Sequence, residues 1–277
     1  MPSLGQNLWF GFFDIPLEDR LRAVRAVGFD DVMIWWAPSE RAKPSFPGRI
    51  RDGGPEEVYE AAVKAGLGIR TAHFPTWRAE ALWLDDEQGE DYEREFAAAL
   101  RACGERGIKN LVMHTTRKLV TPPPNMTGAE RLRRLTDLAE KAGVDIAVEN
   151  TRFPEYNRFL FERVPHPRVR FCYDCGHEHC FTPGQDVLGE FGSMMVTMHL
   201  HDNNGPAAGD EHAMPGEGNV DFAALAPRLK AMAPESYNLE SQVTRRDEEA
   251  GMGLEEYLDK SVTALRAIVS GKAPPRL

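Results

Sequence analysis

The sequence of 277 residues carries a formal net charge of −10, with 42% hydrophobic and 27% charged residues, as in an ordinary globular domain. This acidic balance disfavours broad attraction to a polyanion, so we expect no nucleic-acid partner. No apolar run approaches the roughly 18 residues that span a bilayer, and the first residues lack the pattern of a secretory signal. We therefore expect a cytoplasmic protein with no membrane partner. Four cysteines are too few for a disulfide framework in this chain, which predicts reduced thiols.

Short apolar or β-branched runs alternate along the chain with amphipathic runs of helical length. The predicted strands are residues 8–13, 31–36, 68–73, 110–114, 145–149, 169–174, 195–199 and 237–240. The predicted helices are residues 17–27, 56–65, 92–106, 129–142, 156–163, 222–232 and 254–269, with a short one at 186–191. Because parallel strands need a crossover helix between them, this alternation predicts a single (β/α)8 TIM barrel. The one domain covers residues 1–277, with 270–277 as a loose tail.

Long connections follow the second, third, fourth and seventh predicted strands. They are residues 37–55, 75–89, 115–128 and 201–220, and they are rich in Pro, Gly and Trp. All of them leave the carboxyl ends of strands, where barrels of this kind build their active sites. We therefore expect the functional site at that mouth.

A histidine or a carboxylate stands at the end of most predicted strands. These residues are His73, His114, Glu149, Asp174, His199 and Glu240. Because the strands of a parallel barrel all point to one mouth, residues far apart in sequence would converge there. Imidazole nitrogen together with carboxylate oxygen suits a divalent transition metal, with zinc or manganese first and cobalt or iron as alternatives. One such residue could simply meet solvent, but the whole set favours a metal centre.

Two further stretches supply candidate ligands. His177 follows Asp174 by a short turn, and Asp210 and His212 lie close together in the connection after the seventh strand. Cys172, Cys175 and Cys180 fall in the same region, but their unequal spacing favours packing over a separate zinc site.

Several segments strengthen this interpretation when they are taken in chain order. They are Gly28-Phe-Asp-Asp-Val, Thr71-Ala-His-Phe-Pro, Val112-Met-His, Ala147-Val-Glu-Asn, Tyr173-Asp-Cys-Gly-His, Met198-His-Leu-His-Asp-Asn and His212-Ala-Met-Pro-Gly-Glu-Gly-Asn-Val-Asp. With them the chain resembles, over nearly its whole length, the xylose isomerase-like TIM-barrel superfamily. That superfamily includes sugar isomerases, epimerases, inosose dehydratases and DNA repair enzymes of the endonuclease IV type.

The resemblance implies two different metal sites. In the sugar enzymes one metal would be held by the positions Glu149, Asp174, His199 and Glu240. In the repair enzymes three metals would use these positions and further ligands, so the number of ions stays open between one and three. The candidates for these additional metal or substrate ligands are His73, His114, His177, Asp210 and His212.

His201 competes with His199, because residues two apart on a strand face the same side. We take His199 as the ligand, since His-Leu-His-Asp matches the family pattern there, and expect His201 to contact the substrate. His177 has three open roles: binding the metal, binding a substrate oxygen, or orienting Asp174.

A sugar-like small molecule is the expected partner. Trp77 and Trp83, with Trp35 and Trp36 nearby, could cover the C–H face of a sugar, although packing in the core or a lid is an equal alternative. Arg117 is a further expected substrate contact. A phosphorylated substrate would need a cationic anchor, for which the candidates are Arg117, Lys118, Arg152 and Arg245.

The leading hypothesis is a metal-dependent isomerase or epimerase of a small sugar or sugar phosphate. Glu149 and Glu240 would be its catalytic pair, one removing a proton beside a carbonyl and the other returning it. The alternatives are a metal-dependent phosphodiester or phosphate-ester hydrolase of the endonuclease IV type, a dehydratase of polyol-derived ketones, and a barrel that only binds. The resemblance also implies a homo-oligomer.

Overall fold

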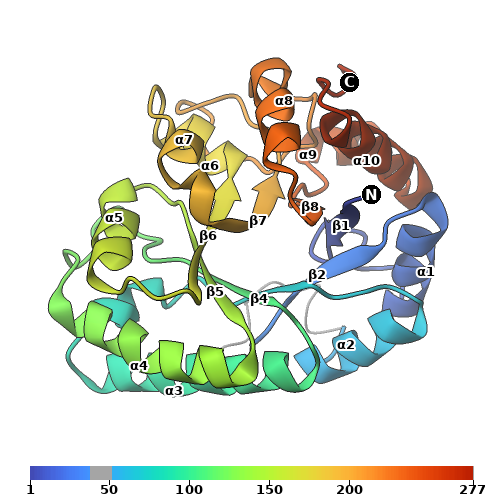
Figure 1. The fold of residues 1–277 in the computed structure, drawn as a ribbon. Helices are drawn as coiled ribbons and strands as arrows, with labels where there is room; N and C mark the ends of the chain where they lie inside the picture. The colour runs from blue at the N-terminus through green and yellow to red at the C-terminus, as the bar shows by residue number, and fades with distance from the viewer. Residues whose placement is uncertain (38–51, 277) are drawn as a thin grey trace.

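The structure is a computed structural model that describes residues 1–37 and 52–276. Parallel strands β1 to β8 close into a barrel in sequence order, and helices surround it (Figure 1). The strands are β1 (Ser3–Asn7), β2 (Asp31–Trp35), β3 (Thr71–His73), β4 (Asn110–Met113), β5 (Asp145–Glu149), β6 (Val169–Asp174), β7 (Met195–Leu200) and β8 (Ser236–Leu239). The predicted (β/α)8 barrel is therefore confirmed.

The helices begin and end where the sequence offers caps. They are α1 (Leu17–Val27), α2 (Pro55–Lys64), α3 (Glu87–Glu105), α4 (Met126–Ala142), α5 (Pro154–Arg163), α6 (Cys175–Phe181), α7 (Val187–Phe191), α8 (Phe222–Met232), α9 (Arg245–Glu249) and α10 (Leu254–Val269), with the 3-10 turns η2 (Ala79–Trp83) and η3 (Gly192–Met194). The Asp86 side chain accepts hydrogen bonds from two backbone N–H groups at the start of α3. Gly28 and Gly143 end α1 and α4 in the left-handed conformation, which glycine adopts without a steric cost.

The first strand differs from its prediction. The apolar run at residues 8–13 is not a strand; β1 is the preceding segment Ser3–Asn7, which pairs with β2 and β8. A Cβ atom at Gly5 would collide with the side chain of Asn238 on β8, so this strand needs a small residue where a β-branched one would be expected. The apolar run instead forms part of the β1–α1 connection, in which Gly11 and Phe12 have positive φ angles of 131° and 57°.

A polar network fills the middle of the barrel beneath the mouth. The hydroxyl oxygens of Thr71 and Thr197 lie 3.3 Å apart across the interior, and Asn238 Nδ2 donates to Thr197 Oγ1 at 3.0 Å. Side chains two residues apart on a strand face the same side. His73, His199 and Glu240 are each two residues further along, so they face the interior at the carboxyl end of the barrel.

The ends of the chain and the long connections complete the fold. The tail expected to be loose is partly packed, because Pro274 is buried and Arg276 Nη1 donates to the carbonyl of Gly218 at 2.6 Å. Most of the predicted long connection 37–55 lies outside the described residues, and so does the last residue. Among the described helices, none combines the length and apolarity needed to cross a lipid bilayer.

Candidate metal centre

Glu149, at the end of β5, is the hub of the site. Its Oε2 lies 3.1 Å from His73 Nε2 and 3.0 Å from His114 Nε2. Its Oε1 lies 3.2 Å from the Nδ1 atoms of both His177 and His199. One fully buried carboxylate therefore touches histidines from four different segments of the chain.

The first possible metal position lies between the ends of β5, β6, β7 and β8. Glu149, Asp174, His199 and Glu240 each present a ligand atom within 4.8 Å of the others, and all four are buried. His199 Nδ1 lies 2.8 Å from Glu240 Oε2 and 3.8 Å from Asp174 Oδ2. Ligand atoms at about 2.0–2.1 Å from one tetrahedral metal are about 3.3 Å apart, so these spacings suit a shared ion.

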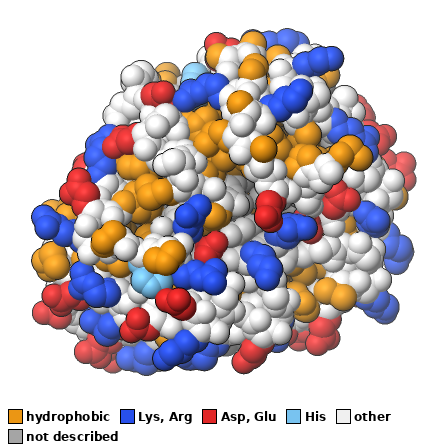
Figure 2. Space-filling model, viewed as in Figure 1, with side chains coloured by type: hydrophobic (Ala, Val, Ile, Leu, Met, Phe, Trp, Pro, Cys, Tyr) orange, Lys and Arg blue, Asp and Glu red, His pale blue; other side chains and the backbone are white. Residues whose placement is uncertain are grey.

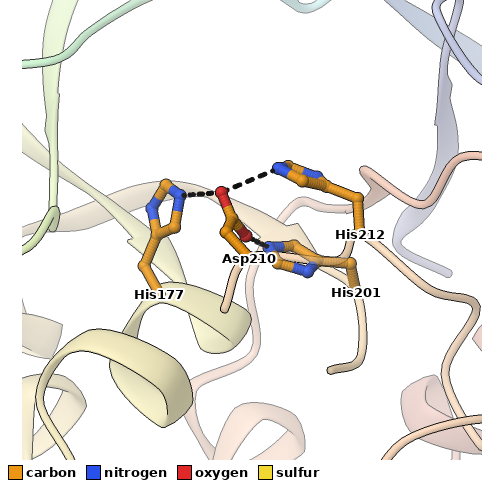
Figure 3. A group of neighbouring side chains, drawn as sticks. All are labelled: His177, His201, Asp210 and His212. Atoms are coloured by element: carbon orange, nitrogen blue, oxygen red, sulfur yellow. Dashed lines mark hydrogen bonds and ion pairs between the residues drawn. The ribbon is translucent and has the colours of Figure 1, made fainter. Parts of the chain in front are cut away.

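A second group lies beside it and is centred on Asp210 (Figure 3). Asp210 Oδ2 is 3.2 Å from His177 Nε2 and 3.1 Å from His212 Nε2, and its Oδ1 is 3.7 Å from His201 Nε2. The rings of His201 and His212 stack with centroids 4.1 Å apart. His201, expected as a substrate contact, thus stands among possible metal ligands, and its Nε2 is also 3.0 Å from Asp174 Oδ1.

Glu149 links two further groups of possible ligands. One comprises His73, Glu149 and His199, and the other comprises His114, Glu149 and His177. Every metal-ligand candidate from the sequence therefore belongs to a single continuous cluster, in which Glu149 and Asp174 connect the parts.

Backbone carbonyls fix the orientation of three imidazoles. The Nδ1 atoms of His73, His177 and His212 lie 2.7, 2.9 and 2.9 Å from the carbonyl oxygens of Phe74, Asn150 and Glu240, respectively. An N–H at Nδ1 that donates to a carbonyl leaves Nε2 with its lone pair free to bind a metal. In all three residues Nε2 faces a carboxylate of the cluster.

The donor set fits divalent metal better than it fits an empty polar core. His199 Nε2 and His201 Nδ1 are buried nitrogen atoms without a hydrogen-bond partner in the structure, and the buried Glu240 Oε2 has only the 2.8 Å ion-pair contact with His199 Nδ1. Buried polar atoms of this kind are costly unless another group satisfies them, and a cation between the carboxylates would do so for Glu240. Mixed nitrogen and oxygen ligands favour zinc, manganese, cobalt or iron over magnesium or calcium.

The carboxylates and imidazoles shift one another's pKa values. Burial alone would raise the pKa of Glu149, but the nearby His114 and His199 hold it well below its ordinary value. Burial would likewise raise the pKa of Glu240, yet His199 lowers it to about 2. In His212 burial opposes the charge, but Asp210 raises the pKa to about 10. Nearby carboxylates also raise the pKa of His177 and His199, so without metal, protons on these residues and on His212 balance part of the clustered negative charge.

Some supporting residues were not singled out by the sequence. Asn150 Nδ2 donates to the carbonyl of Asp174 at 2.8 Å, and its Oδ1 accepts from the Asp174 N–H at 2.7 Å. Asp202 accepts from the N–H groups of Gly216 and Val220, both at 2.9 Å, and so holds the connection that carries Asp210 and His212. The motif Glu-Asn after β5 was a signal for Asn150, and the motif His-Leu-His-Asp contains Asp202, but the role of Asp202 in holding the connection is visible only in the fold.

Aromatic side chains form one wall beside the cluster. The Trp35 ring lies 4.5 Å from the His73 ring and 6.0 Å from the Trp77 ring, and Trp9 contacts both Trp35 and His73. Trp77 is half-buried at this wall, and its contact with substrate stays a prediction. Trp9 was not predicted to be there, because it fell within the segment expected to be a strand.

Two other tryptophans are part of the protein core. Trp83 is 2% exposed, its indole N–H donates to the carbonyl of Thr115 at 2.7 Å, and its ring packs against Tyr156. Trp36 is fully buried beneath the guanidinium of Arg106. Both side chains therefore pack in the core, which was one of the two alternatives for the tryptophans. The burial of Trp83 does not support its expected contact with substrate.

The expected cationic anchors are dispersed. Arg117 and Lys118 are exposed, and their backbone N–H groups donate to the buried Glu80. Arg152 stacks on Phe181, and Arg245 pairs with Glu249 at 2.8 Å. Figure 2 shows acidic and basic side chains interspersed over one face of the barrel rather than a field of one sign.

The cysteines are packed. All of them are free and buried, and burial raises the pKa of Cys172 and Cys180 to about 12. Among the described residues, no group of possible metal ligands includes a cysteine. This agrees with packing rather than a separate thiolate zinc site.

Curated relatives are sugar isomerases and epimerases or uncharacterised proteins. The chain is 26% identical over 206 residues to an inosose isomerase of Bacillus velezensis, covering 64% of this chain and 74% of the relative. It is 24% identical over 248 residues to a fructoselysine 3-epimerase of Shigella flexneri, covering 83% and 86%. A match of 38% identity to the uncharacterised protein y4fM of Sinorhizobium fredii spans only 24% of that protein and 28% of this chain.

Solved structures share the fold. A D-psicose 3-epimerase from Clostridium cellulolyticum H10, with D-tagatose, has a TM-score of 0.74 at 14% identity and covers 96% of this chain and 99% of its own. The IolI protein with a bound zinc atom also has a TM-score of 0.74, at 20% identity, covering 97% and 98%. The family model described as xylose isomerase-like TIM barrel matches residues 21–267. The chain therefore belongs to the xylose isomerase-like TIM-barrel family.

Proposed function

We propose that this chain is a divalent-metal-dependent isomerase or epimerase of a small sugar-like substrate. The observation that carries the proposal is the buried quartet Glu149, Asp174, His199 and Glu240, whose ligand atoms lie within 4.8 Å of one another at the ends of β5 to β8. Relatives named as an inosose isomerase and a fructoselysine 3-epimerase support this reaction class. A cytoplasmic location and a homo-oligomeric state stay predictions.

The two glutamates suit proton transfer at carbon. In each turnover one glutamate, as the ionised carboxylate, accepts a proton from a C–H group beside a carbonyl, and the other, protonated from solvent, can donate a proton to the opposite face. Removal of the proton leaves an enediolate. Donation of a proton by the second glutamate to the other face of the same carbon gives epimerisation. Donation of a proton to the neighbouring carbon, together with transfer of a proton between the two oxygens, gives isomerisation. Glu149 and Glu240 flank His199 from different strands, so they can approach a substrate from different sides.

A metal ion held by Glu149, Asp174, His199 and Glu240 would polarise the substrate carbonyl and stabilise the negative charge of the enediolate. Asn150 orients Asp174 through two hydrogen bonds of 2.8 and 2.7 Å. His177 receives its orientation from the Asn150 carbonyl and can bond a substrate oxygen through Nε2. Trp35 and Trp77 would cover an apolar face of the sugar.

Hydrolysis of a phosphate ester is the second candidate, and one specific observation favours it. The cluster extends beyond the quartet through His73, His114 and the group around Asp210, so it offers ligands for more than one ion. Several metals could share the charge of a phosphate and its leaving group. A dehydratase of polyol-derived ketones would use the same quartet and differs only in the loss of a hydroxyl after proton removal.

Metal stoichiometry and substrate tests together separate these functions. The protein, purified without added metal or chelator, would be analysed by elemental mass spectrometry and assayed with free ketoses, inososes and a phosphodiester. About one metal per chain and interconversion of ketoses, with solvent deuterium incorporated at the reacting carbon, would support the proposal. Two or three zinc ions with phosphodiester cleavage would support hydrolysis. No metal binding after loading with zinc, manganese or cobalt would refute both.

A further inference from the structure

A cavity of about 460 Å³ lies between the connections that follow β1 and β8. Its lining includes Trp9 and Phe13 from the β1–α1 connection, and Gln242, Val243 and Met252 from the region after β8. A volume of this size is within the range of small-molecule sites, which is about 300–1,000 Å³. The backbone N–H of Val243 donates to the carbonyl of Phe10 at 2.7 Å and joins the two walls.

Two contacts connect this cavity to the metal centre. The Trp9 ring, which lines the cavity, meets the His73 ring edge-on at 6.2 Å. Gln242, on the other wall, donates its backbone N–H to the carbonyl of His212 at 2.7 Å. One residue from each wall of the cavity therefore contacts a ligand candidate, which places the cavity next to the metal centre at the barrel mouth.

The β1–α1 connection keeps an unusual shape to form this wall. Gly11 and Phe12 have φ angles of 131° and 57°, and Phe12 is in a region that non-glycine residues rarely occupy. A Cβ atom at Gly11 would collide with Val243. Strained backbone of this kind persists when its surroundings hold it, and it is concentrated at binding sites.

Of the described residues that line the cavity, two are charged and both are acidic: Asp14 and Glu248. Within residues 1–37 and 52–276, two arginines near it pair with other carboxylates. Arg20, whose guanidinium lies over Phe13, forms an ion pair with Asp52, and Arg245 pairs with Glu249. Arg152 lies elsewhere, against Phe181 at α6. The rest of the lining is mainly aromatic and aliphatic.

We propose that this cavity receives the end of the substrate remote from the reacting carbonyl, and that Asp14 and Glu248 select against a phosphate or carboxylate at that end. The preferred substrates are then neutral polyols or sugars with a cationic amino substituent, rather than sugar phosphates. This inference rests on the proposed function for its carbonyl-bearing substrate. It goes beyond that function by naming the charge class of the substrate.

The test compares ligands that differ only in charge. These are D-fructose, D-fructose 6-phosphate and 6-amino-6-deoxy-D-fructose, together with the corresponding 1-phosphate and 1-amino compounds, because either end could enter the cavity. An exposed carboxylate several ångströms from a negatively charged ligand group lowers kcat/KM about threefold in a water-like dielectric. Because the cavity has two such carboxylates, we expect kcat/KM to be about tenfold lower for the phosphate ester than for the neutral sugar. In the Asp14→Lys/Glu248→Lys protein this preference should vanish or reverse. In Asp14→Asn/Glu248→Gln it should decrease.

The control is Asp137→Lys, which makes the charge change of one of these two substitutions at an exposed position of α4 and should keep the wild-type order. If a phosphate ester is used as well as its neutral parent, or if the double variants keep the wild-type ratio, the charge-selection inference is wrong. If none of the sugars is turned over, the proposed function fails for this class. Calorimetric binding of the same ligands to the metal-loaded protein then tests the charge order by itself.

Discussion

The two sides of the barrel mouth differ in the kind of side chain that they present. The ends of β5 to β8 carry the quartet of ionisable ligands, buried and joined to their neighbours by hydrogen bonds. The ends of β1 and β2 carry Trp9 and Trp35, and Trp77 joins them from the connection after β3. Charge and fixed geometry on one side suit bond breaking, whereas aromatic surface and a cavity on the other suit recognition. We therefore expect substitutions on the two sides to change different kinetic constants.

Glu149→Gln should have the largest effect. The amide keeps the size of the side chain but removes the charge that four histidines face and one ligand oxygen of the quartet. We expect kcat to fall at least about 1,000-fold, because a proton acceptor and a metal ligand are lost together. Steady-state kinetics and elemental analysis would measure both losses. Retention of more than a tenth of the activity would remove Glu149 from the catalytic role.

Asp210→Asn tests whether the second ligand group is part of the working site. Asp210 faces His177, His201 and His212, so its loss should weaken an ion bound there by about 10- to 100-fold. If the quartet alone binds metal for catalysis, kcat should change by less than about tenfold while total metal content falls. Titration with zinc, followed by counting bound ions, would show this. An unchanged zinc titration would indicate that this group is only a hydrogen-bond network.

The polar side of the mouth was much easier to predict from sequence than the aromatic side. His73, Glu149 and Asp174 end regular strands, and His199 is the last residue but one of β7. A strand prediction and the convergence of parallel strands therefore place them in one volume. The β1 region could not be predicted this way. Its strand has a glycine where a side chain from β8 fills the interior, and the apolar run that resembles a strand is a strained connection.

Tryptophans show the same limit of sequence reasoning. Trp77 and Trp83 lie in one connection and look alike in the sequence, but one is at the wall beside Trp35 and the other is in the core. Only the packing of Trp83 against Gly128 and Tyr156 distinguishes them. The joint grouping of His177, His201 and Asp210 likewise depends on how Asp202 holds the β7–α8 connection.

The stability of the metal-free protein should depend on pH through the ionisable side of the mouth. His212 and His177 have raised pKa values in the fold, so their stabilising contribution is complete below pH 6.5 and is lost as pH rises, for His212 through about 10. Glu240, lowered to about 2, contributes stability above pH 4.5 that is lost as pH falls.

Unfolding temperatures in chelator should therefore be highest between about pH 4.5 and 6.5, and should fall by about 5 °C towards pH 10. Bound metal replaces the protons as the balancing charge, so the alkaline decrease should largely disappear after zinc loading. His212→Gln should reduce the decrease in the metal-free protein. A flat or rising profile towards pH 10 in chelator would contradict the proposed charge balance.

Trp77→Ala and Trp83→Ala should give the smallest and most selective changes in turnover. Loss of the half-buried Trp77 ring should raise KM about fivefold and leave kcat and the unfolding temperature nearly unchanged, because stacking on a sugar contributes about 1 kcal/mol. Trp83→Ala should instead destabilise the protein by about 3–5 kcal/mol, since it empties a filled part of the core, with kcat/KM per folded molecule preserved. Steady-state kinetics paired with denaturant unfolding would separate the two effects. If Trp83→Ala raised KM while Trp77→Ala only lowered stability, the assignment of the two rings would be reversed. Trp83 would then contact the substrate at the mouth, and Trp77 would belong to the core.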